Sequence, residues 1–209
     1  MERLIKRMLS GLGLALTGAL VVTAWAQNPV VRVRGDVESL SGGKLTVKTV
    51  GGESLRISLA EKVMVVALKK ADMGAIKTGS YIATTSVKTA AAQEAEEVMV
   101  FLESGRGTAE GHFPWDQGTG TMMTNANVNA EVQQANGREL TLSPKGQAMK
   151  ITVPARAVIV QQELADTSLL VPGARVFFGA QKAADGSLSA GRVYVGKGCA
   201  PSKAWVHCK

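Results

Sequence analysis

The sequence predicts an all-β protein, made of two tandem small barrels behind an N-terminal export signal. Three observations lead to this prediction. Apolar residues alternate with polar ones along many short segments, as in half-buried strands. The pattern of residues 37–47 returns 95 positions later, in residues 132–142, which indicates a duplicated unit. A cationic start followed by an apolar run opens the chain.

The first 26 residues have the organisation of a cleaved signal peptide. Arg3, Lys6 and Arg7 precede an apolar run that ends in the small residues Ala24 and Ala26. Glycine and hydroxyl residues interrupt this run, which is shorter than the roughly 20 residues of a membrane-spanning helix. We expect cleavage after Ala26 and a periplasmic or secreted mature chain without stable membrane insertion. An uncleaved anchor is the alternative.

The two halves share a strand, a turn at glycine and a second strand. Residues 37–47 read V-E-S-L-S-G-G-K-L-T-V, and residues 132–142 read V-Q-Q-A-N-G-R-E-L-T-L. Next, alternating apolar residues around Ile57 match a similar stretch around Ile151, which indicates a third strand in each half. The two halves therefore begin with the same order of elements.

Each half continues with a brief helical turn, a glycine and further strands. Residues 75–82 align with residues 169–176, so Gly79 corresponds to Gly173. Glycine suits this point because the chain must turn from a short helix into a strand, which favours a positive φ. The last strands, at residues 95–100 and 190–195, alternate in the same way.

These elements predict one small barrel for each repeat. About five or six short strands with one helical insertion suit a small closed or nearly closed barrel, such as an OB-fold. Closure is favoured because it buries the edges of a small sheet, and an open sandwich is the alternative. We expect barrels at residues 27–104 and 128–196, an inter-repeat segment at 105–127 and a tail at 197–209.

The inter-repeat segment has no counterpart in the other half. Its glycine and threonine content is typical of a loop, but Phe113, Pro114 and Trp115 are poor choices for a flexible spacer. We therefore expect residues 105–127 to pack across both barrels.

Three features resemble an exported bacterial domain, domain of unknown function 5666: an L-x-V-x-T stretch, the turn before Gly79 and Gly173, and an A-x-x-V-x-V stretch. The resemblance covers the mature body and implies tandem OB-like barrels without a catalytic residue. Residues 111–116, Gly-His-Phe-Pro-Trp-Asp, resemble the inter-repeat segment of two-repeat relatives often labelled metal ABC transporter permease. That label conflicts with a single apolar segment at the N-terminus. The tail lies beyond the resemblance.

Charge and composition argue against several classes of function. Removal of residues 1–26, which hold three cations and Glu2, lowers the net charge from +7 to +5. Nucleic-acid binding would need clustered cations among aromatic residues, but aromatic residues make up 4% of this chain. No glycine-rich phosphate loop precedes a predicted helix, so no nucleotide cofactor is expected.

Candidate site residues cluster in the inter-repeat segment, where His112, Phe113, Trp115 and Asp116 could contact a ligand. His112 and Asp116 invite an acid–base interpretation. The simpler interpretation is that they fix the glycine-rich loop against the barrels, because no serine, histidine and aspartate triad is evident. Trp115 is similarly expected to anchor packing, and it could also hold a sugar or peptide.

The tail holds both cysteines. In an oxidising compartment we expect Cys199 and Cys208 to form a disulfide. The alternative is a metal site of these cysteines with His207, to which Met122 and Met123 could add thioethers. The tail does not have the paired ligand spacing of structural zinc.

These observations favour a non-enzymatic binding or interaction module of the bacterial cell envelope. The expected partner is an envelope ligand or protein, without nucleic acid and without a cofactor. A periplasmic metal-handling protein using Cys, His and Met ligands is the first alternative, and a hydrolase centred on His112 and Asp116 is the second.

Overall fold

The computed structural model describes residues 29–196 and residue 205. In this part of the chain strands alternate with four single 3-10 turns, η1 (Met73–Ala75), η2 (Glu103–Gly105), η3 (Pro144–Gly146) and η4 (Thr167–Leu169). The strands are β1 (Val30–Ser41), β2 (Lys44–Thr49), β3 (Ser54–Ala71), β4 (Tyr81–Lys88), β5 (Gln93–Val100), β6 (Gly111–Pro114), β7 (Thr121–Gln134), β8 (Gly137–Leu142), β9 (Met149–Pro154), β10 (Val158–Ala165), β11 (Arg175–Lys182) and β12 (Leu188–Gly196). The predicted all-β class is confirmed.

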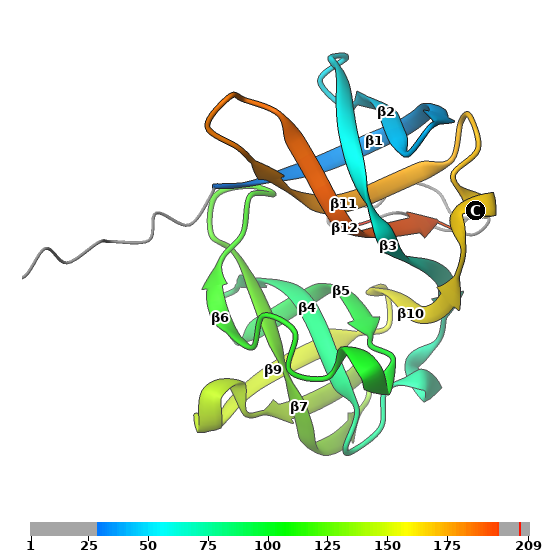
Figure 1. Ribbon diagram of the computed structural model, residues 1–209. Coiled ribbons are helices and arrows are strands. Elements are labelled where there is room, and N and C mark those ends of the chain that lie inside the picture. Colours follow the sequence, from blue (N-terminus) through cyan, green and yellow to red (C-terminus); the bar gives the residue numbers. More distant parts are fainter. Residues whose placement is uncertain (1–28, 197–204, 206–209) are drawn as a thin grey trace, which may run out of the picture.

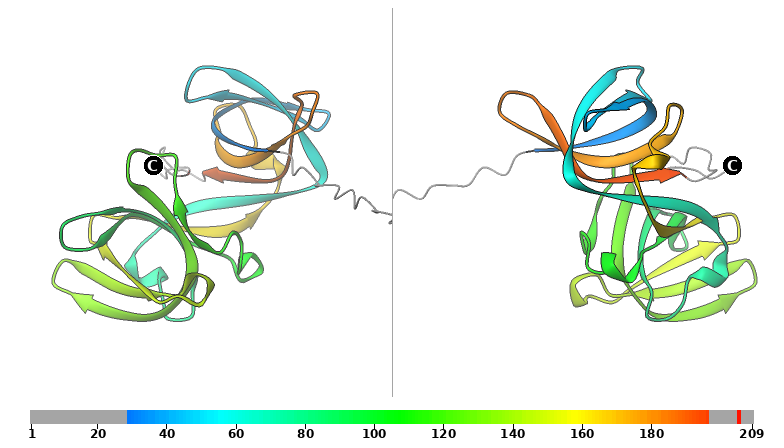
Figure 2. Two further views of the ribbon diagram at one scale, coloured as in Figure 1. Left: turned by 90° about the vertical axis from the view of Figure 1, so that its left-hand side faces the viewer. Right: turned by 45° about the vertical axis from the view of Figure 1, so that its right-hand side comes forward.

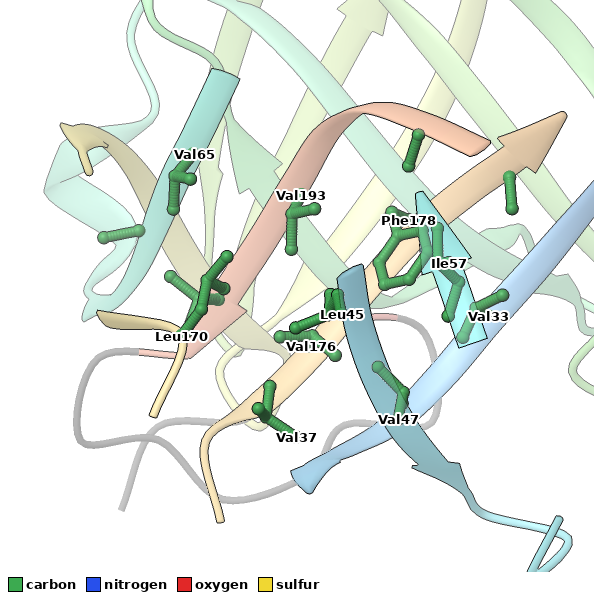
Figure 3. Packing of buried hydrophobic residues seen from close by; sticks show 14 residues of the cluster. Val33, Val37, Leu45, Val47, Ile57, Val65, Leu170, Val176, Phe178 and Val193 are labelled. Atoms are coloured by element: carbon green, nitrogen blue, oxygen red, sulfur yellow. The ribbon is translucent and has the colours of Figure 1, made fainter. Parts of the chain in front are cut away.

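Five strands form a closed barrel, here called the first barrel (Figure 1). Its order is β1-β2-β3-β12-β11 and back to β1, with β12 and β3 parallel and the other pairs antiparallel. Alternate side chains of these strands point inward, including Leu45, Ile57 and Phe178, which are fully buried (Figure 3). Burial of this apolar face is the main stabilising contribution to the barrel.

A second ring of strands, here called the second body, lies below the first barrel in Figure 1. Antiparallel pairs join β5, β4, β7, β8 and β9 in that order. A single parallel residue pair, Glu94 with Thr152, connects β5 to β9 and completes the ring. Its interior is apolar, with Ile82, Leu140 and Ile151 fully buried.

The two bodies exchange strands, which differs from the expectation that each barrel is one continuous range. β11 and β12, from residues 128–196, complete the first barrel, whereas β4 and β5, from residues 27–104, lie in the second body. The long strand β3 pairs antiparallel with β10, and the chain passes from one body to the other along this pair (Figure 2). Sequence periodicity identifies similar strands in the two halves of the chain, but such strands can pair within their own half or with the other half.

The helical turns and glycines predicted for the two halves of the chain form as expected. Gly79 has φ 88° and Gly173 has φ 82°. Before them, the Asp72 and Asp166 side chains accept hydrogen bonds of 2.8 Å from the backbone of η1 and η4. An aspartate cap thus starts each turn, and a glycine directs the chain into the next strand.

Two element boundaries differ from the prediction. β3 is one strand of 18 residues, whereas its counterpart divides into β9 and β10, because the chain turns after Pro154 with a 3.0 Å hydrogen bond from the Ala157 N–H to the Pro154 carbonyl. β7 already begins at Thr121, so the inter-repeat segment supplies half of a strand. Threonines and asparagines occupy this part of β7, so its sequence does not show the alternation of apolar and polar residues that indicates a half-buried strand.

A third apolar cluster lies between the two bodies. It combines Val66 and Leu68 of β3 with Tyr81, Phe177 and Trp205. The predicted leader and the tail residues Cys199, His207 and Cys208 lie outside the described residues. None of the helices described in residues 29–196 has the length and hydropathy to span a bilayer.

Candidate ligand-binding site

The short strand β6 places the predicted site residues. It pairs antiparallel with the first half of β7, with His112 opposite Thr124 and Phe113 opposite Met123. Side chains of a strand alternate between its two faces. His112 and Pro114 are accordingly exposed, whereas Phe113 and Trp115 are partly buried.

A hollow of about 340 Å³ lies between β6 and the turn that contains η3. Glu110, Gly111, His112, Phe113, Pro144, Lys145 and Gln147 line it. Phe113 and Pro144 are the apolar lining residues, and Glu110, His112, Lys145 and Gln147 are the polar ones. Mixed apolar and polar lining of this kind is common in ligand sites.

A hydrogen bond fixes the turn against the start of β6. The Lys145 backbone N–H donates to the Glu110 carboxylate over 3.0 Å, and Lys145 has the left-handed angles φ 49° and ψ 39°. A Cβ atom on Gly111 would lie 3.6 Å from Cε of Lys145, so the lysine stem passes close to the Gly111 backbone. The turn and β6 therefore form two walls of one hollow.

His112 has its own hydrogen-bond partner. Its Nδ1 lies 2.8 Å from the Thr124 hydroxyl oxygen. Although His112 is exposed as a whole residue, desolvation of its imidazole by neighbouring groups lowers the pKa of the ring, so the neutral form is favoured at pH 7. At this pH the imidazole offers hydrogen bonds without a positive charge.

Trp115 and Asp116 bind the first barrel. Arg34 of β1 donates to both carboxylate oxygens of Asp116, over 3.0 and 2.8 Å, and Arg32 forms a 3.7 Å ion pair with the same group. The Arg32 guanidinium lies 4.1 Å from the centre of the Trp115 ring, and Phe177 of β11 makes an edge contact with that ring at 6.4 Å. The inter-repeat segment therefore packs across both bodies, as the sequence indicated.

Opposing effects act on the pKa of Asp116. Burial alone would raise it, but the hydrogen bond from Arg34 and the charges of Arg34 and Arg32 lower it below its ordinary value. The carboxylate is therefore fully ionised at neutral pH, as its paired geometry requires.

The structure divides the four predicted site residues into two groups. His112 and Phe113 line the hollow, while Trp115 and Asp116 form the contact with the first barrel. Phe113 connects the groups, because its ring centre lies 6.3 Å from that of Trp115. His112 and Asp116 hydrogen-bond different residues, so the geometry does not join them as an acid–base pair.

Sequence reasoning missed Glu110, Lys145 and Gln147. The Ser-Pro-Lys-Gly stretch at 143–146 indicates a turn. Its contact with β6 depends on the pairing of β7 with both β6 and β8. No local pattern could reveal that contact.

The residues proposed as metal ligands are only partly described. Met122 and Met123 are consecutive in β7 and so point to opposite faces of the sheet, which prevents them from chelating one ion together. In residues 29–196 and at residue 205, no group of three or more His, Cys, Asp or Glu side chains could hold a metal ion. The proposed ligands in the tail fall outside this range.

Comparison of the chain with protein-family models, curated proteins and solved structures found no significant match.

Proposed function

We propose that this protein is a non-enzymatic binding module of the bacterial cell envelope. In this proposal the chain is exported, loses residues 1–26 and folds into two OB-like barrels. The closed five-stranded order β1-β2-β3-β12-β11, with one parallel pair, supports the OB-like assignment for the first barrel. The cationic and apolar leader supports export.

The main support for ligand binding is the hollow beside β6. Its volume of about 340 Å³ is in the range of small-molecule sites, and apolar and polar groups converge on it. The turn at 143–147 is held to Glu110, and β6 is held by β7 on one side and by the Trp115 contacts on the other. Such restraint reduces the entropic cost of binding a ligand.

Titration of the mature protein with soluble fragments of envelope glycans tests this proposal. Because Phe113 lines the hollow and contacts Trp115, ligand binding should change the Trp115 fluorescence. The variant Trp205→Phe removes the other tryptophan of the mature chain. We expect a saturable change that Phe113→Ala abolishes, and that the control Val132→Ala, at an exposed position of β7, retains.

Calorimetry with the same fragments provides an independent measurement. If no envelope fragment produces saturable heat or fluorescence change with the folded wild-type protein, the binding proposal is wrong. Binding that survives Phe113→Ala in full would place the ligand elsewhere on the molecule.

A further inference from the structure

The hollow contains a cation without an ion-pair partner among the described residues. Some lysines of the second body and its neighbourhood are paired, as Lys150 is with Glu139 at 2.8 Å and Lys69 is with Glu163. In the described ranges, no carboxylate comes within ion-pair distance of the Lys145 ammonium. Glu110 contacts the backbone of Lys145 instead.

The backbone of Lys145 holds this cation at the hollow. Left-handed backbone angles are less favourable for a lysine than for a glycine, and residues held in them are frequent at functional sites. The Glu110 hydrogen bond stabilises the conformation, and the stem of Lys145 lies against Gly111. A side chain at position 111 would narrow the space beside the lysine stem.

The other groups of the hollow suit hydroxyls and an apolar ring face. The Gln147 amide and the Glu110 carboxylate can hydrogen-bond hydroxyl groups. The Phe113 ring and Pro144 offer apolar surface, on which the C–H face of a sugar can pack. The negative charge of Glu110 disfavours a doubly charged phosphate more than a singly charged carboxylate.

We infer that the hollow beside β6 binds an acidic sugar residue, with its carboxylate at Lys145, its hydroxyls at Glu110 and Gln147, and its ring face on Phe113. This inference rests on the binding function proposed above and specifies the ligand class. The carboxylate provides a charge-assisted contact that a neutral sugar lacks.

Calorimetric titration of the mature full-length protein tests the inference with three probes: a glucuronic acid oligomer, a glucose oligomer of the same length and inorganic phosphate. We expect the acidic oligomer to bind at least about tenfold more tightly than the neutral one, and phosphate to bind more weakly than the acidic oligomer. The affinity for the acidic oligomer should also fall as salt is added.

Two variants assign this selectivity to Lys145. Lys145→Gln should remove about tenfold of the affinity for the acidic oligomer and leave the affinity for the neutral one unchanged. Lys145→Arg, which keeps the charge, should retain most of the selectivity and also controls for folding of the turn. Lys150→Gln, an exposed lysine of β9, is the matched control and should change neither affinity.

The outcomes separate this inference from the proposed function. Equal affinity for both oligomers, or selectivity that Lys145→Gln leaves intact, overturns the inference while the binding function stands. Tighter binding of phosphate than of the acidic oligomer also overturns it. If no envelope fragment binds at all, both proposals are wrong.

Discussion

At the scale of single residues, one carboxylate joins the inter-repeat segment to the first barrel. Asp116 accepts two hydrogen bonds from Arg34, and both arginines of β1 lie over the Trp115 ring, at 4.1 Å for Arg32 and 5.6 Å for Arg34. The planar guanidinium matches a carboxylate with two parallel hydrogen bonds, and it also stacks on aromatic rings. Arg34 performs both roles at once.

Substitution of Asp116 tests this contact. We expect Asp116→Asn to lower the free energy of unfolding by about 1 kcal/mol at pH 7, because the paired arginines lose their carboxylate. The measurement is urea unfolding, with Glu38→Gln, an exposed carboxylate also carried by β1, as the control. A loss equal to that of the control would contradict the assigned role.

The same variant should show a defined pH dependence. Since the pKa of Asp116 is lowered in the folded protein, its stabilisation is complete above the ordinary carboxyl pKa of about 4. It is lost as the pH falls through the folded pKa. The stability difference between the wild type and Asp116→Asn should therefore shrink below about pH 4.

The sequence identified some residues of the site because they were unusual for their surroundings. Phe113 and Trp115 stood out among glycines and threonines, and His112 is one of only two histidines. Lys145 is one of many cations in a basic chain, so its sequence context carries no comparable signal. Only the folded arrangement brings it to the hollow beside Phe113.

At the scale of elements, close backbone approach decides where glycine is required. A Cβ on Gly35 of β1 would lie 2.1 Å from the carbonyl oxygen of Lys48, in the neighbouring strand β2. Gly191 of β12 offers a contrast, because nothing lies within 4 Å of a Cβ there. Both glycines are inside strands, so the sequence pattern alone does not distinguish them.

Substitution by alanine should change the stability of the protein differently at these two glycines. We expect Gly35→Ala to destabilise the protein by about 1–3 kcal/mol, because β1 and β2 must separate or shift. Gly191→Ala should leave stability nearly unchanged or raise it slightly, since alanine restricts the unfolded chain. Chemical denaturation of both variants provides the test, and similar losses would contradict the strand packing described for Gly35.

The strands themselves were predictable to different degrees. Alternation around Ile57 and Ile151 identified half-buried strands, and both turn glycines were correctly placed. The first half of β7 was missed because buried polar residues occupy it. The Thr124 hydroxyl lies within hydrogen-bond distance of His112, and the Asn125 amide donates to the Thr108 carbonyl over 3.1 Å. Hydrogen bonds thus allow polar side chains to be buried here, and the sequence does not show the apolar alternation of a half-buried strand.

At the scale of the whole molecule, the exchange of strands makes the two bodies interdependent. The first barrel needs β11 and β12 from the second half of the chain, and the second body needs β4 and β5 from the first half. The third apolar cluster and the β3–β10 pair lie where the bodies meet. The sequence pattern predicted about five or six strands in each half, but it could not assign them to a body, because strands of both halves offer similar partners.

We expect that neither half of the chain folds without the other. A protease site inserted after the exposed Gly118 separates β1 to β6 from β7 to β12 once it is cut. We expect the cut protein to keep its mass in size-exclusion chromatography and its cooperative unfolding, because both bodies need both fragments.

The decisive measurement is the unfolding of each fragment after the two are separated in denaturant and diluted alone. The exchanged arrangement predicts that neither fragment forms a monomer with a cooperative thermal transition, and that mixing the fragments restores the native circular dichroism spectrum. A cooperatively folded monomer of either fragment would contradict it.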